Sequence, residues 1–203
     1  MANNNVEIEI QAKLAKIKPL LAFLKKKGKL VGKKRQKDYY FSPEDKEKDF
    51  LKVRPVVEWL RLRDARLDSA KRADGKLSVN YKYWHHNKNG RSYFSDEYET
   101  EIGSIEQGEK ILKALKFRPI ATVSKVRQIW NYKDYEIAVD KVKSLGDFVE
   151  IEYMSSAKSA FAKKIGDEMI KFLKDLGCGK IELSWQGYPF QLLFPEEVEY
   201  EEV

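Results

Sequence analysis

The sequence predicts an α+β fold in which antiparallel strands dominate. Two observations support this prediction. Seven short segments alternate apolar with charged or polar side chains, which is the period of a β-strand, and three longer segments place apolar residues at helical spacing. No internal repeat, linker or low-complexity block divides the chain. We therefore expect a single domain that spans residues 1–203.

The strand segments follow one another along most of the chain, and the sequence leaves room for an eighth. They cover Val6–Leu14, Glu58–Asp64, Leu77–Trp84, Glu97–Ile102, Val123–Trp130, Tyr135–Asp140 and Phe148–Tyr153. The run Asn87-Lys88-Asn89-Gly90 predicts a hairpin turn between two of them, because Asn and Gly tolerate positive φ angles.

Three helices are predicted between or after these strands. They cover Ile17–Lys27, Ser104–Leu115 and Ser156–Leu176, and a glycine follows the first and the last. The second begins with a possible capping box formed by Ser104 and Gln107.

The polar face of each strand segment carries charge, and both signs occur. Side chains two residues apart share a face of a strand, so these residues form stripes: Glu7, Glu9, Gln11 and Lys13; Arg61 and Arg63; Asn80 and Lys82; Glu97, Glu99 and Glu101; Lys125 and Arg127; Glu136 and Asp140; Glu150 and Glu152. Two interpretations are open. The sheet could have one solvated face, or it could close into a barrel with the charged stripes inside and the apolar stripes under the helices.

The closed barrel would give these charges a chemical use. Carboxylate oxygens suit Mg²⁺ or Mn²⁺, and Arg and Lys side chains bind phosphate oxygens. Burying so many charges without a ligand would cost on the order of several kcal/mol per unpaired ion, so the cavity would have to stay wet or filled. The stripes therefore favour a site for a polyphosphate and its divalent metal.

Six elements of the chain resemble the CYTH superfamily of class IV adenylyl cyclases and thiamine or inorganic triphosphatases. They are VEIEIQAK at 6–13, RLR at 61–63, YKY around Lys82, EYETEI at 97–102, KVR at 125–127 and LGDFVEIE at 145–152. The resemblance implies a closed eight-stranded antiparallel β-barrel, the triphosphate tunnel, with helices packed outside. Within the superfamily, DYYF at 38–41, EWLRLRD at 58–64, LGDFVEIE at 145–152 and GYPF at 187–190 look more like the class IV cyclases.

The resemblance also implies roles for the charged residues. The metal ligands would be Glu7, Glu9, Glu150 and Glu152, with Glu99 and Asp140 as further candidates. The phosphate-binding residues would be Arg61, Arg63, Lys82, Lys125 and Arg127, and the catalytic residues would be Gln11, Lys13, Lys82 and Arg127. The alternative for each carboxylate is a structural ion pair, and for each cation a solvated strand face.

One position departs from the family pattern. The signature Glu-x-Glu-x-Lys has a lysine where this chain has Gln11, and Lys13 is the next residue expected on the inner face. An amide can hydrogen-bond a phosphate but cannot supply a charge. The expected function is a metal-dependent adenylyl cyclase that converts ATP to cyclic AMP and pyrophosphate. A triphosphatase acting on inorganic, thiamine or nucleoside triphosphate is the first alternative, and a non-catalytic nucleotide-binding protein is the second.

The bulk composition adds weaker expectations. The net charge of +7 fits a phosphate-bearing partner, but the basic stretch from Lys25 to Lys37 is interpreted as a solvated helix end and loop, so nucleic acid ranks last. The single Cys178 excludes an intrachain disulfide, and no apolar segment approaches a membrane span. We expect a cytoplasmic protein without a membrane partner, for which a homodimer remains possible. The four tryptophans could stack a base, or pack in the core and at the tunnel rim.

Overall fold

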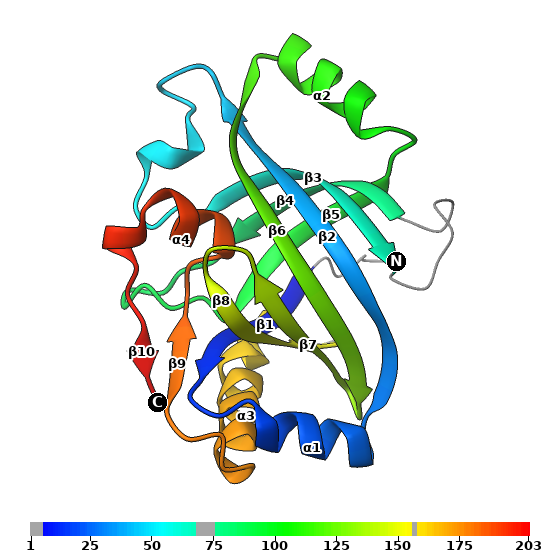
Figure 1. The fold of residues 1–203 in the computed structure, drawn as a ribbon. Helices are drawn as coiled ribbons and strands as arrows, with labels where there is room; N and C mark the ends of the chain where they lie inside the picture. Colours follow the sequence, from blue (N-terminus) through cyan, green and yellow to red (C-terminus); the bar gives the residue numbers. More distant parts are fainter. Residues whose placement is uncertain (1–5, 68–75, 156–157) are drawn as a thin grey trace.

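Eight antiparallel strands form a closed barrel in the computed structural model, which describes residues 6–67, 76–155 and 158–203 (Figure 1). The strands are β1 (Val6–Leu14), β2 (Lys29–Pro43), β3 (Glu58–Leu67), β4 (Lys76–Trp84), β5 (Phe94–Glu101), β6 (Phe117–Tyr132), β7 (Tyr135–Val142) and β8 (Gly146–Tyr153). They follow the order β1-β5-β4-β3-β2-β6-β7-β8, and β8 pairs back with β1 to close the barrel. The predicted closed eight-stranded barrel is confirmed.

Strand β1 has three partners, and this matters for the site. It pairs with β5 through Val6–Ile8, with β8 through Glu9–Ala12, and with β9 (Ile181–Ser184) through Gln11–Leu14. A short strand β10 (Glu201–Glu202) extends the sheet beyond β9. The last residues of β1 therefore leave the barrel and enter a small extension of the sheet.

The alternation in β1 separates the core from the interior of the barrel. Ile8, Ile10 and Ala12 are buried in an outer apolar cluster, whereas Glu7 and Glu9 line the inside. Helices α1 (Lys18–Lys27) and α3 (Ala162–Asp175) contribute apolar side chains to this cluster. The apolar stripes thus lie under helices, as expected, and the charged stripes face inward.

Two further helices complete the fold. Helix α2 (Ile105–Ala114) is capped by Ser104, whose hydroxyl accepts a hydrogen bond from the main-chain amide of Gln107 at 3.2 Å, and this is the Ser104 half of the predicted capping box. Helix α4 (Tyr188–Leu193) lies against β6 and supplies Tyr188 and Pro189 to the interior of the barrel. None of the helices among the described residues has the length and apolar character that crossing a lipid bilayer requires.

Strand β2 was not predicted, and its composition explains why. The structure makes a strand of residues 29–43, where the sequence suggested a helix end followed by a loop. Lys33, Arg35 and Lys37 are exposed on one face, and the other face carries Lys34 and Gln36 toward the cavity. Because both faces are polar here, the apolar half of the alternation is missing.

The predicted elements differ from the observed ones only at their ends, whereas β9, α4 and β10 were not predicted. The Asn87–Gly90 turn joins β4 to β5 as predicted, with the Asn87 amide donating to the Arg91 carbonyl and a φ angle of 73° at Gly90. The third predicted helix, α3, starts at Ala162 instead of Ser156, after a short 3₁₀ turn at Ser159–Phe161. Residues 156–157 lie outside the described part of the chain.

Candidate functional site

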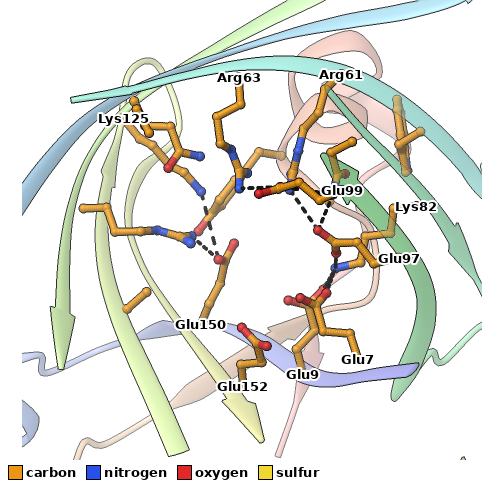
Figure 2. A pocket seen from close by; sticks show the side chains of 18 of the residues that line it. Glu7, Glu9, Arg61, Arg63, Lys82, Glu97, Glu99, Lys125, Glu150 and Glu152 are labelled. Atoms are coloured by element: carbon orange, nitrogen blue, oxygen red, sulfur yellow. Dashed lines mark hydrogen bonds and ion pairs between the residues drawn. The ribbon is translucent and has the colours of Figure 1, made fainter. Parts of the chain in front are cut away.

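The barrel encloses a polar cavity of about 210 Å³ that side chains from all eight strands and from α4 line. Figure 2 shows Glu7, Glu9 and Glu152 on one side of it, with Arg61, Arg63 and Lys125 facing them from the other. Eleven of the predicted site residues line this cavity: Glu7, Glu9, Gln11, Arg61, Arg63, Lys82, Glu99, Lys125, Arg127, Glu150 and Glu152. Lys13 and Asp140 do not.

The acidic side of the cavity holds like charges in register. Glu9 on β1 lies opposite Glu152 on β8, and Glu152 lies opposite Glu136 on β7. Directly opposed like charges destabilise a sheet. Among the described residues, none forms an ion pair or a hydrogen bond with Glu152. Burial and the repulsion from Glu9 and Glu136 raise the pKa of Glu152 to about 7, against a weaker attraction from Lys82.

One ammonium group is shared by three carboxylates on this side. Nζ of Lys82 lies 2.5 Å from both Glu7 Oε2 and Glu9 Oε1, and 3.2 Å from Glu97 Oε2. Burial alone would lower the pKa of Lys82, but the three carboxylates raise it well above its usual value. For Glu7 the balance is reversed: burial, together with Glu9 and Glu97, holds its pKa well above the usual range in spite of Lys82. The acidic side therefore has three carboxyl groups for a single ammonium.

The opposite side is cationic, and a buried carboxylate fixes its first arginine. Arg63 donates from Nε to Asp38 Oδ1 at 2.8 Å and from Nη2 to Asp38 Oδ2 at 3.2 Å, and Gln36 Nε2 donates to Oδ2 at 2.9 Å. Burial would raise the pKa of Asp38, but Arg63 and Arg61 hold it well below its usual range. Arg61 lies beside this pair, with Nη2 3.4 Å from Glu97 Oε1.

A second buried carboxylate fixes Arg127. Its Nε lies 2.7 Å from Asp140 Oδ1 and its Nη2 2.5 Å from Oδ2. Lys125 Nζ lies 3.2 Å from Oδ2, and the Tyr188 hydroxyl donates to the same oxygen at 2.9 Å. The sequence suggested Asp140 as a metal-ligand candidate. Its side chain instead has 0% exposure behind the cavity wall, where it holds two phosphate-binding candidates in place.

Glu150 belongs to the cationic side rather than to the acidic one. Its Oε1 accepts a hydrogen bond from Gln11 Nε2 at 3.0 Å, and its Oε2 contacts Arg127 and lies 4.0 Å from Lys125 Nζ. Burial would raise its pKa, but Arg127 and Lys125 hold it well below the usual range. Both oxygens of this predicted metal ligand therefore already have cationic or amide partners.

Two other predicted residues lie at the edges of the site. Glu99 has a side chain 43% exposed, 3.9 Å from Arg63 Nη1. Lys13 does not face the cavity, contrary to expectation, because β1 exchanges β8 for β9 after Ala12. Its Nζ lies over the rings of Phe148 and Tyr200, at 5.0 and 4.4 Å from their centroids.

The sequence did not identify several residues that build the site. Asp38, Gln36 and Lys34 come from the unpredicted strand β2, and Gln191 comes from α4. The motifs DYYF and GYPF did contain signals, because they include Asp38 and the cavity residue Tyr188. Of the tryptophans, Trp59 and Trp84 line the cavity, whereas Trp130 and Trp185 pack in the outer core.

The carboxylates are not arranged as a metal site while Lys82 lies between them. In the described ranges, no three His, Cys, Asp or Glu side chains stand ready to hold a metal ion. The donor set nevertheless fits a hard divalent cation, because Glu7 and Glu9 share one ammonium and Glu152 lies opposite Glu9, which brings three carboxyl groups together.

Comparison with known proteins agrees with this geometry. The CYTH domain model matches residues 5–188. A protein of Methanocaldococcus jannaschii with the name "Putative adenylate cyclase" is 32% identical over 184 residues, which are 90% of this chain and 96% of that protein. A solved structure from Pyrococcus horikoshii OT3 has a TM-score of 0.76 at 24% identity, covering 94% of this chain and 99% of that one. A conserved hypothetical protein from Pyrococcus furiosus has a TM-score of 0.63 at 26% identity, covering 95% and 94%. The chain belongs to the CYTH domain family.

Proposed function

We propose that this protein is a metal-dependent adenylyl cyclase that converts ATP to cyclic AMP and pyrophosphate inside its barrel. The observation that supports a triphosphate substrate most directly is the division of the cavity into a cationic side and an acidic side, where Glu7 and Glu9 share one ammonium and Glu152 lies opposite Glu9. A polyanion with its divalent cation matches both sides at once. The choice of cyclisation follows the name of the Methanocaldococcus jannaschii relative.

The phosphates would bind to Arg61, Arg63, Lys125 and Arg127. Two of these four, Arg63 and Arg127, are held by bidentate contacts with buried carboxylates before any ligand arrives. Cations fixed in this way lose little orientation entropy on binding and can stabilise negative charge that develops on the leaving pyrophosphate. Lys82 would join them once it is released from Glu7 and Glu9.

The divalent cation, Mg²⁺ or Mn²⁺, would be held by Glu7, Glu9 and Glu152. When bound, it supplies neutralisation of phosphate charge and activation of an oxygen nucleophile. We leave Asp140 and Glu150 out of this set because their oxygens hold Arg127 and Lys125. Glu99 remains a candidate at the edge of the cavity.

The nucleoside would extend toward the aromatic part of the cavity. Trp59 and Trp84 line it, and Trp84 lies 3.7 Å from the position of a Cβ on Gly187, next to the start of α4. An indole ring offers a stacking surface to an adenine. Stacking there would anchor the base, so that the ribose 3′-hydroxyl and not water meets the α-phosphorus.

Product analysis tests the proposal. Purified protein is incubated with ATP and either Mg²⁺ or Mn²⁺, and the products are separated by anion-exchange chromatography. Cyclic AMP with an equal amount of pyrophosphate is the expected result. Orthophosphate from ATP or from inorganic tripolyphosphate would instead establish the triphosphatase. Tight binding of intact ATP without product would establish the nucleotide-binding protein.

A further inference from the structure

Gln191 on α4 is a buried polar side chain with a complete set of partners and no role so far. Its side chain is 1% exposed. Nε2 lies 2.8 Å from Gln11 Oε1, 3.0 Å from Ser184 Oγ and 3.0 Å from the main-chain oxygen of Gln186. Its Oε1 accepts a hydrogen bond from the Tyr200 hydroxyl at 3.0 Å. Four segments of the chain therefore meet at this one amide.

These partners leave the Gln191 amide one orientation. A main-chain carbonyl can only accept, so Gln191 must present its nitrogen to Gln186. Its oxygen then points to Tyr200, and its second N–H is left for the side of Gln11 and Ser184. A flipped amide would place two oxygens against each other at Gln186.

The orientation passes from Gln191 to Gln11. Because Gln191 donates an N–H, Gln11 must accept this hydrogen bond with its side-chain oxygen. The nitrogen of Gln11 is thereby turned toward Glu150, to which it donates at 3.0 Å. An amide can do both, since it accepts at one end and donates at the other, whereas an ammonium can only donate. A lysine at position 11 would set its ammonium against the N–H of Gln191.

Glu150 is the third member of this chain of contacts. Gln11 occupies its Oε1, so its Oε2 is free to contact Arg127, whose other hydrogen bonds go to Asp140. Without the Gln11 contact, the carboxylate could rotate and release the outer edge of the guanidinium.

We infer that Gln191 is a positioning residue: through Gln11 it holds Glu150, and with it Arg127, in the orientation that binds phosphate. The inference rests on the proposed triphosphate site and adds to it a residue from α4 that does not touch the substrate. It also explains the glutamine at position 11 as one half of a matched pair with Gln191.

Calorimetric titration with inorganic tripolyphosphate, with and without Mg²⁺, tests the inference. Gln191→Leu keeps the approximate volume and removes the polar atoms, and we expect it to weaken binding about tenfold, as for the loss of a hydrogen bond to a charged group. Glu182→Gln on β9 is the matched control, because Glu182 pairs with Lys180 at the surface, and its affinity should equal that of the unmodified protein.

Two double variants distinguish the proposed positioning role of Gln191 from a purely structural role. Adding Gln11→Leu to Gln191→Leu should cost no further affinity, because both act on one chain of contacts. In an Arg127→Met background, Gln191→Leu should also have no further effect. If the affinity losses of the two single variants multiplied in either double variant, the two residues would act independently and the inference would be overturned. If Gln191→Leu does not fold, Gln191→Glu replaces it with the same expectation, because this variant presents an oxygen to Gln11.

The possible failures are distinct. If the unmodified protein binds no tripolyphosphate, the proposed function fails and this inference fails with it. If the unmodified protein binds and Gln191→Leu binds equally well, the triphosphate site stands and only the role of Gln191 is overturned.

Discussion

Arg63 and Asp38 lie directly opposite each other on β3 and β2, and two parallel hydrogen bonds of 2.8 and 3.2 Å join the guanidinium to the carboxylate. Asp38 is 1% exposed, whereas Arg63 still lines the cavity. The pair therefore has one end in the wall and one end in the site. It fixes the direction of a phosphate-binding group, so loss of the pair should lower both the free energy of unfolding and the affinity for phosphate.

The first prediction concerns stability. Asp38→Asn keeps the shape but leaves the Arg63 charge without its buried partner, so we expect the free energy of unfolding to fall by about 3 kcal/mol. Urea denaturation at pH 7 measures it. Lys76→Ala is the control, since it breaks a fully exposed pair with Glu101 and should change stability little. A loss for Asp38→Asn as small as that of the control would contradict the prediction.

The same pair predicts a pH dependence. The folded protein holds the pKa of Asp38 well below its usual range, so the unfolded chain takes up this proton first as the pH falls. The stabilisation is complete above the usual pKa of about 4 and is lost progressively below it. The stability difference between the unmodified protein and Asp38→Asn should therefore be constant from neutral pH to about pH 5 and shrink below about pH 4. A difference that grew on acidification would have the wrong sign.

The sequence predicted the barrel and most of its lining because seven strands carry an apolar stripe, which identifies the outer face and therefore also the inner one. In β1, Ile8 and Ile10 mark the outer face, so Glu7 and Glu9 had to be inside. Strand β2 has no such reference between residues 33 and 37, and Asp38 was missed with it. The prediction that Lys13 faces the cavity was wrong for another reason. Alternation within β1 does not reveal that its pairing partner changes from β8 to β9.

The residues that hold the cavity-lining side chains in place could not be predicted from sequence patterns within single strands or helices. Gln191 is 180 positions from Gln11 in the chain. The residues around it indicate only the start of a short helix, and nothing in them points to a contact with β1. Asp140 and Glu150 have the alternation of cavity residues, yet ion pairs with Arg127 and Lys125 decide their role. Which carboxylates remain unpaired is a property of the closed barrel and not of any strand.

Glu152 predicts opposite effects on stability and on metal binding. Glu152→Gln removes the repulsion from Glu9 and Glu136 on the neighbouring strands, so we expect the free energy of unfolding at pH 8 to rise by up to about 1 kcal/mol. The same change should weaken Mn²⁺ binding, because an amide oxygen carries no charge. Urea denaturation and Mn²⁺ titration followed by electron paramagnetic resonance measure the two effects. A variant that is less stable and binds Mn²⁺ normally would show that Glu152 is a structural residue.

Lys82 predicts opposite effects on the two ligands. Lys82→Gln removes the only ammonium within 4 Å of Glu7 and Glu9 in the described ranges. Mn²⁺ should then bind several-fold more tightly to the protein without nucleotide, and tripolyphosphate should bind more weakly. Lys125→Gln is the matched control, because this lysine is equally buried but contacts Asp140 and Glu150. It should weaken tripolyphosphate binding without tightening Mn²⁺ binding. Equal Mn²⁺ affinity for Lys82→Gln and the unmodified protein would show that Lys82 does not compete with the cation.

The last prediction concerns the lysine of the family signature. Gln11→Lys adds a positive charge to the cationic side, which by charge alone should strengthen phosphate binding. The contacts predict the reverse, because the ammonium would meet the N–H of Gln191 inside a buried network and leave that donor unpaired. We expect Gln11→Lys to weaken tripolyphosphate binding about tenfold. Gln11→Lys combined with Gln191→Glu gives the ammonium an acceptor and should recover most of the affinity. If Gln11→Lys alone bound tripolyphosphate more tightly than the unmodified protein, charge and not the matched amide pair would govern this position.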